Sequence, residues 1–198
     1  MTATSTATLD LPREDASSRV NATLGMVFFI GSWSMAFGTL YLSFLILRDR
    51  VGTWPPPGIE LPSFAIATLA TAVLVLSSVA IHAAVKRGRQ GQAGFAGLWA
   101  VGMALGFAFA VIQAWLWFDL LASGRTPRSG VYESLFYGLT WVHAAHVALA
   151  LISLVWIQVG IARGRYGRHL ISTVQNTAMF WHFMDVVWVV LYLSFFIF

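Results

Sequence analysis

Five long apolar stretches constrain the fold of this chain more than any other feature of its sequence. Each has at least 23 residues and carries few charges. A transmembrane helix needs about 20 predominantly apolar residues, so each stretch is long enough to cross the hydrocarbon layer with some tilt. The sequence therefore predicts an all-α integral membrane bundle of five transmembrane helices, at about residues 22–47, 63–85, 95–121, 131–162 and 172–198.

Composition excludes a soluble fold. Of the 198 residues, 58% are hydrophobic and only 10% are charged, whereas soluble domains have about 25% charged residues. A soluble domain of this length has too small an interior to bury so much apolar surface. The net charge of +4 does not indicate nucleic-acid binding, because the basic residues lie mostly in short loops between the apolar stretches. The lack of cysteine excludes disulfides, Cys-ligated zinc, iron–sulfur clusters and thiol catalysis.

The distribution of basic residues predicts how the chain is oriented in the membrane. The N-terminal tail and the second and fourth loops together carry eight Lys and Arg residues, while the first and third loops carry four. Because basic residues favour the cytoplasmic side, we expect the N-terminus in the cytoplasm and, after five spans, the C-terminus in the periplasm. Residues 1–20 are rich in Ser, Thr and Ala without an apolar period, which predicts a disordered cytoplasmic tail. Residues 21–198 are then expected to form a single five-helix membrane domain.

Two pairs of polar residues lie within the apolar stretches at helical spacing. His143 and His146 are three residues apart, as are His182 and Asp185, so each pair shares one helix face. An ionisable side chain in a membrane span often marks a functional site. The histidines are candidate ligands for haem or a metal, and His182 with Asp185 is a candidate proton relay. The alternative is hydrogen bonding between neighbouring helices, which we favour because no other feature of a cofactor site or a proton path accompanies them.

The other polar residues of the spans are expected to serve structure. Asp119 and Glu133 are predicted near the outer interface, where the membrane tolerates charge. Small hydroxylated residues and one mid-span amide are suited to contacts between helices, and they include Ser77, Ser78, Thr140 and Gln113. The residue types provide no nucleophile–base set and no phosphate-binding loop, so we predict no catalytic residue.

The last apolar stretch contains a motif of a known family. Residues 181–188, WHFMDVVW, resemble the W-H-F-x-D-V-V-W signature of subunit III of the haem–copper oxidases. Five further segments resemble motifs of that family in the same order: 25–30 (GMVFFI), 54–59 (WPPPGI), 105–114 (LGFAFAVIQA), 129–132 (SGVY) and 140–147 (TWVHAAHV). The resemblance covers about residues 22–198, and six motifs in order make it specific.

This resemblance implies an accessory subunit III, in the short five-helix bacterial form, of a proton-pumping terminal oxidase in the bacterial plasma membrane. Such an oxidase, a cytochrome c oxidase, passes electrons from cytochrome c to oxygen, which is reduced to water in aerobic respiration. Subunit III carries no redox centre and no cofactor of its own except phospholipid. It stabilises catalytic subunit I, which holds the haems and copper, and supports its proton uptake. The implied partners are subunit I, subunit II, a small subunit IV and membrane lipids, but no nucleic acid.

The resemblance gives the motif residues a role in packing, and it makes none of them catalytic, cofactor-binding or metal-binding. Helix packing and contact with another subunit or with lipid are implied for Trp54, His143, His146, Trp181, His182, Asp185 and Trp188. Trp54 also suits the aromatic belt at the membrane interface. Three arginines of the fourth loop are candidates for binding anionic lipid headgroups, with simple control of topology as the alternative: Arg163, Arg165 and Arg168.

Two positions depart from the family pattern. A carboxylate in the first helix of many members falls on Trp33, and a glutamate often found before the W-H-F motif falls on Gln175. We expect Trp33 to fill the space by packing and acid chemistry at both positions to be lost. The departures leave open a subunit III-like protein of a quinol oxidase or a nitric oxide reductase. Two alternatives of other classes are a stand-alone membrane cytochrome that binds haem through these histidines, and a small transporter.

Overall fold

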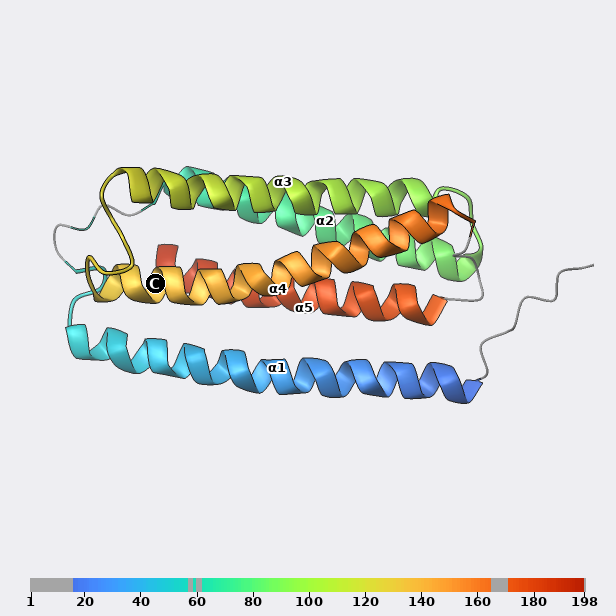
Figure 1. Cartoon of the computed structure of the whole chain (residues 1–198), viewed down its shortest axis with the longest axis horizontal. Coiled ribbons are helices and arrows are strands. Elements are labelled where there is room, and N and C mark those ends of the chain that lie inside the picture. Colours follow the sequence, from blue (N-terminus) through green and yellow to red (C-terminus); the bar gives the residue numbers. More distant parts are fainter. Residues whose placement is uncertain (1–15, 57–58, 60–61, 165–170, 198) are drawn as a thin grey trace, which may run out of the picture.

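Five helices make up the part of the chain that the computed structural model describes, which is residues 16–56, 59, 62–164 and 171–197. They are α1 (Ala16–Val51), α2 (Phe64–Gln90), α3 (Phe95–Ala122), α4 (Val131–Ala162) and α5 (Ile171–Phe196). All five are long and apolar enough to cross a membrane, and they run along the long axis of the molecule (Figure 1). The predicted all-α class with five membrane-spanning helices is confirmed.

The helices extend beyond the apolar stretches, most clearly in α1. The first span was predicted at about residues 22–47, whereas α1 begins at Ala16 and ends at Val51. A helix continues past an apolar segment because its backbone hydrogen bonds do not depend on side-chain polarity. The last turn contains Arg48 and Arg50, whose charged ends suit water or lipid headgroups. Residues 16–20, expected in the tail, are therefore helical, and residues 1–15 lie outside the described residues.

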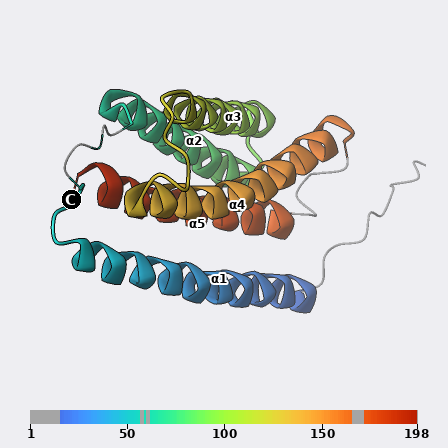
Figure 2. The ribbon, with the colours of Figure 1, turned by 60° about the vertical axis from the view of Figure 1, so that its left-hand side comes forward.

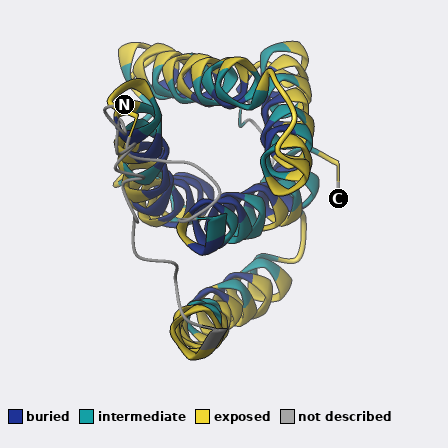
Figure 3. Ribbon diagram, turned by 90° about the vertical axis from the view of Figure 1, so that its right-hand side faces the viewer, coloured by how far each residue is buried: buried dark blue, intermediate teal, exposed yellow. Residues whose placement is uncertain are grey.

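Helix α5 is the central helix of the fold. It contacts α1, α2 and α4, and 50% of its membrane-spanning window is buried, the largest share among the five helices. Helix α1 is the opposite case: its main contacts are with α5 and, to a smaller extent, α4, and only 11% of its window is buried. Figures 2 and 3 show α1 as a separate rod beside the group formed by the other four helices. The helix that carries the family-like motif is thus the one that contacts α1, α2 and α4 together.

Helices α2 and α3 form the most extensive pair in the fold. Two buried glycines of α3, Gly102 and Gly106, are four residues apart. A Cβ atom at Gly102 would lie 2.7 Å from Ile81 Cδ1 of α2, and a Cβ atom at Gly106 would lie 2.7 Å from Trp181 Cη2 of α5. Small residues at this spacing let membrane helices approach closely. The two glycines therefore allow Ile81 and Trp181 to pack directly on the backbone of α3.

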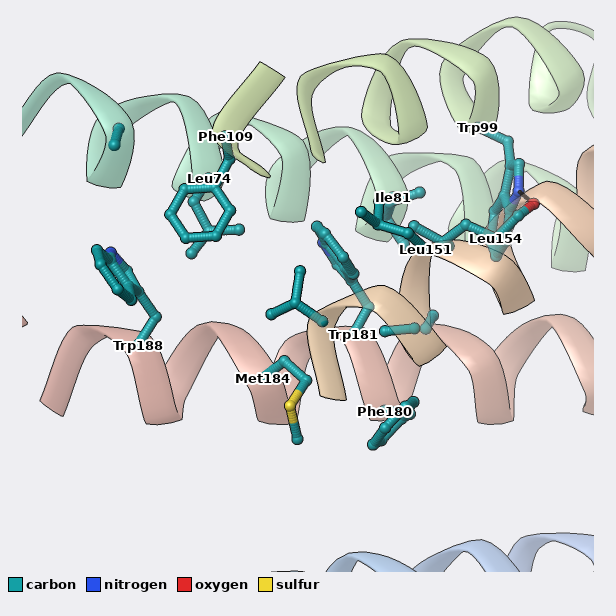
Figure 4. Packing of buried hydrophobic residues seen from close by; sticks show 14 of the residues in the cluster. Leu74, Ile81, Trp99, Phe109, Leu151, Leu154, Phe180, Trp181, Met184 and Trp188 are labelled. Atoms are coloured by element: carbon teal, nitrogen blue, oxygen red, sulfur yellow. Dashed lines mark hydrogen bonds between the residues drawn. The ribbon is translucent and has the colours of Figure 1, made fainter. Parts of the chain in front are cut away.

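Two clusters of buried apolar side chains connect the helices. The larger cluster lies mainly among α2, α3, α4 and α5, with Phe37 added from α1. Figure 4 shows part of it; its members include Leu74, Ile81, Trp99, Phe109, Leu154, Trp181 and Trp188. The smaller cluster lies where α1 and α5 end and α4 begins, and it includes Phe44, Tyr132, Phe136, Tyr137 and Phe195. Aromatic side chains form most of the smaller cluster, and in the larger cluster they pack among more numerous aliphatic side chains. The large rings help to hold the helix ends and the centre in register.

Candidate functional site

The motif of α5 turns its two tryptophans toward the other helices. Trp181 is fully covered (0% exposed) and packs on α3 at Gly106. Trp188, which is 1% exposed, donates its Nε1–H to Thr71 Oγ1 of α2 at 3.0 Å. Its ring meets Phe109 of α3 edge-on, with centroids 5.0 Å apart, and Figure 4 shows both indoles on the same side of α5. Side chains and backbone of this chain itself therefore cover both rings.

His182 and Asp185 connect α5 to α2. The Oγ atom of Ser78 on α2 lies 2.5 Å from Nδ1 of His182, within hydrogen-bonding distance. Asp185 Oδ2 lies 3.6 Å from the same nitrogen, and Asp185 is buried with 8% of its surface exposed. Neither carboxylate oxygen has a hydrogen-bond partner among the described residues. His82 of α2 places its ring 6.1 Å from the His182 ring, so the group forms a polar contact between two helices.

The two histidines of α4 have different surroundings despite their spacing. His146 Nδ1 lies 2.7 Å from the carbonyl oxygen of Val142 on its own helix, and its ring meets Trp33 of α1 edge-on with centroids 4.0 Å apart. His143 is 2% exposed and stacks on Trp188, with centroids 5.7 Å apart and planes at 28°. Within the described parts of the chain, no group of three or more His, Cys, Asp or Glu side chains is placed to hold a metal ion. Each imidazole instead has an aromatic neighbour from another helix.

Trp33 lies in α1, where the resemblance leads us to expect a carboxylate. Besides its contact with His146, its ring lies 6.2 Å from Phe29 and 6.4 Å from Phe37, both on α1. The indole is half-buried where α1 meets α4. This arrangement agrees with the packing role expected for a large aromatic side chain at this position.

Trp54 lies in the loop between α1 and α2 and packs into the smaller cluster. Its ring centroid is 5.5 Å from that of Phe44 and 5.1 Å from that of Tyr132. The guanidinium carbon of Arg48 lies 5.8 Å from the Trp54 ring centroid, a cation–π contact. Trp54 thus joins the loop to α1 and α4 in addition to lying near the end of the bundle, where an interface residue was expected.

Basic residues gather at the end of the bundle where α1 and α5 begin. Of the three arginines expected to bind lipid headgroups, Arg163 follows α4 and is exposed, whereas Arg165 and Arg168 lie outside the described residues. A polar pocket of about 390 Å³ at the same end is lined by Arg19 and Arg89, together with Gln175 at the second departure from the family pattern.

Glu133 forms a buried ion pair that was not predicted from the sequence. It was expected near the outer interface, where the membrane tolerates charge, and the structure shows that its side chain is buried there, with 4% exposed. Its Oε1 accepts a hydrogen bond from Arg125 Nη1 at 3.2 Å, which makes an ion pair between the third loop and α4. The Tyr137 hydroxyl donates to the backbone carbonyl of Arg125 at 2.9 Å. The sequence contained one signal for this contact. Glu133 lies in the first turn of α4, where the helix dipole favours an acidic residue, and the loop before it is basic.

The family profile and the individual relatives that match this chain carry the same description. The sequence profile of the family described as cytochrome c oxidase subunit III matches residues 13–198. A cytochrome c oxidase subunit 3 of Thermostichus vulcanus is 30% identical over 173 residues, which cover 85% of this chain and 83% of the relative. Its counterpart in Corynebacterium diphtheriae is 28% identical over 187 residues, covering 92% and 91%. The matches therefore extend over nearly all of the described helices.

Proposed function

The chain belongs to the cytochrome c oxidase subunit III family, and we propose that it serves its oxidase through helix packing and lipid contact, with no redox centre of its own. It is an accessory subunit III of a haem–copper oxidase complex and a multi-pass protein of the bacterial plasma membrane. The proposal concerns what this chain contributes to that complex.

The observation that carries this proposal is the packing of the motif residues within the chain. Trp181 and Trp188 are covered by α2 and α3, and His143 stacks on Trp188. His146 and His182 each have a hydrogen-bond contact through Nδ1, with Val142 and Ser78 respectively. His182 connects α5 to α2 through Ser78, whereas the Val142 contact lies within α4 and His146 reaches α1 through its ring contact with Trp33. Such contacts between helices fix the shape that the oxidase subunits contact.

We propose catalytic subunit I as the main partner, with subunit II and a small subunit IV in the same complex. Apolar side chains on α1 support this proposal, because they face away from the rest of the chain. Phe28 and Met35 are 73% and 78% exposed, and α1 makes few contacts within the bundle. Such a face is suited to neighbouring transmembrane helices or lipid chains.

We propose that the end with the polar pocket faces the cytoplasm and binds an anionic phospholipid headgroup. Arg19 and Arg89 from two helices converge on this pocket, and helix α4, which Arg163 follows in the sequence, finishes at the same end of the bundle (Figure 1). Each basic residue near an anionic membrane surface contributes about 1 kcal/mol. Gln175 adds an amide donor without the negative charge of the family glutamate, which would repel a phosphate. Support for proton uptake by subunit I is proposed on the family relationship alone.

Co-purification tests the proposed partners. The chain is given a C-terminal affinity tag, expressed in its own bacterium and isolated in mild detergent, and the accompanying chains are identified by mass spectrometry. We expect a haem–copper subunit I at about one copy per tagged chain, together with subunit II. Isolation with a quinol-oxidising or nitric oxide-reducing partner would move the chain to one of the related complexes. Isolation of the chain by itself, with a haem absorbance band, would contradict the proposed role.

Replacement of Asp185 tests whether the His182–Asp185 pair serves packing. We expect Asp185→Ala to lower the free energy of unfolding by about 1–3 kcal/mol, because a buried side chain and the carboxyl neighbour of His182 are lost. The haem spectrum of the complex is expected to stay unchanged. Two quantities are measured: the amount of this chain that remains in the purified oxidase after heating, and the visible haem spectrum of the complex. Asp119→Ala is the matched control, since Asp119 is exposed near the end of α3. Loss of haem signal with the chain still bound would assign Asp185 a role in cofactor chemistry.

A further inference from the structure

A small cavity lies between α3 and α4, and two of its lining residues, Phe109 and His143, also contact Trp188 of the α5 motif. Its volume is about 120 Å³. Most of its wall is apolar and comes from Phe109, Ala110, Val147 and Leu151, while its polar lining residues are Gln113, Trp117, Thr140 and His143. The cavity is therefore mostly apolar, and both helices contribute polar side chains to its lining.

Two of these polar side chains are deeply buried and have unused hydrogen-bonding atoms. Gln113 is 4% exposed and His143 is 2% exposed. The amide oxygen and nitrogen of Gln113 and both ring nitrogens of His143 have no hydrogen-bond partner in the parts of the chain that the structure describes. A buried polar group without a partner is costly, and it is normally satisfied by protein or by ordered water.

The other polar side chains of the cavity already have partners. Trp117 donates its Nε1–H to Thr140 Oγ1 at 3.2 Å, and Thr140 Oγ1 donates to the Phe136 carbonyl at 2.6 Å. Among the polar side chains that line the cavity, only the Gln113 amide and the His143 imidazole therefore have donors and acceptors without a partner among the described residues. Together they offer both donors and acceptors, and the cavity lining contains no carboxylate, Lys or Arg. This chemistry fits a small neutral molecule that can both donate and accept hydrogen bonds.

We propose that the cavity holds a cluster of water molecules bonded to Gln113 and His143, which joins α3 to α4 inside the membrane. One water molecule takes about 30 Å³ in the liquid and needs two to four polar partners, so the space accommodates about three or four. A lipid acyl chain fits the apolar wall but leaves all four polar atoms without partners. The proposal rests on the geometry of this chain and stands independently of its place in the oxidase.

Direct observation in the intact oxidase is the first test. A cryo-electron microscopy map of the purified complex, at a resolution that shows ordered water, is examined between α3 and α4. We expect separate density peaks within hydrogen-bonding distance of the Gln113 amide and of a His143 ring nitrogen. Continuous density of an acyl chain, or a direct Gln113–His143 hydrogen bond without solvent peaks, would overturn the proposal. This test needs no variant.

The second test is whether a substitution that fills the cavity lowers or raises the thermal stability of the complex. Ala144 lines the cavity, and Ala144→Val reduces the room for water. In the native background we expect the thermal midpoint for loss of this chain from the oxidase to fall by roughly 4 °C, because polar atoms lose their water partners. In a Gln113→Leu/His143→Phe background, where no polar group needs water, the same substitution is expected to leave the midpoint unchanged or to raise it. Equal shifts in the two backgrounds would contradict a hydrated cavity. If the background variant fails to assemble, the map of the native complex still decides the proposal.

Discussion

Gly102→Val is expected to lower the stability of this chain in its complex by about 3 kcal/mol, the cost of overpacking a tight contact. A Cβ atom at this position would lie 2.7 Å from both Cδ1 and Cγ1 of Ile81, and 3.2 Å from the Ile81 backbone nitrogen. A side chain can rotate away, but the backbone nitrogen can move only if α2 and α3 separate. Separation also weakens the hydrogen bond from Ser77 Oγ to the Gly102 carbonyl, which is 2.7 Å long.

The measurement is the temperature at which half of this chain is lost from the purified oxidase, and the expected fall is roughly 6–12 °C. Gly97→Val is the matched control, because Gly97 lies on the same helix with nothing within 4 Å of its Cβ position. The control keeps the change in helix propensity and removes the clash. Equal midpoints for the two variants would show that close approach of α2 and α3 does not limit stability.

Arg125→Ala is expected to cost about 3 kcal/mol, because it leaves the buried Glu133 carboxylate without its ionic partner. The side chains of the pair are 18% and 5% exposed, respectively. This difference predicts an asymmetry: Glu133→Ala should cost less than Arg125→Ala, because the more exposed Arg125 side chain can turn toward water more easily than the buried Glu133 carboxylate. The hydrogen bond of Tyr137 to the backbone carbonyl of residue 125 is expected to survive both changes, because its acceptor is a backbone atom.

The thermal midpoint of the complex again reports the effect. We expect the double variant Arg125→Leu/Glu133→Leu to be more stable than Arg125→Ala, because replacing both charges removes the unpaired one. Arg128→Ala in the same loop is the control, and its exposed side chain should give a shift close to zero. A double variant that is no more stable than Arg125→Ala would contradict the predicted cost of leaving the Glu133 carboxylate without its ionic partner.

The number of helices and their approximate positions could be predicted from the sequence, because the membrane imposes both length and apolar character on each span. The ends were less predictable. Helix α1 continues into Arg48 and Arg50, since hydropathy marks the hydrocarbon layer, whereas a helix ends where its backbone hydrogen bonds end. The C-terminal stretch was singled out by its motif, and the structure makes it the central helix.

The contacts of the candidate residues could not be predicted, because spacing places residues on a helix face without identifying the neighbouring helix. His143 and His146 share a face by spacing, yet one stacks on Trp188 and the other meets Trp33. The burial of Glu133 was missed for the same reason: its partner lies in a loop whose path depends on the whole fold. The fit between Trp181 and Gly106 also appears only when α3 and α5 are packed together.

The central claim is that this chain supports a haem–copper oxidase without holding a redox centre. Its most direct test is the haem content per catalytic subunit in oxidase purified from a strain that lacks this chain, compared with the complete complex. We expect equal haem absorbance per subunit I in the two preparations, with reduced stability of the preparation that lacks the chain. A fall in absorbance equal to one haem for each missing chain, with subunit I still intact, would contradict the claim.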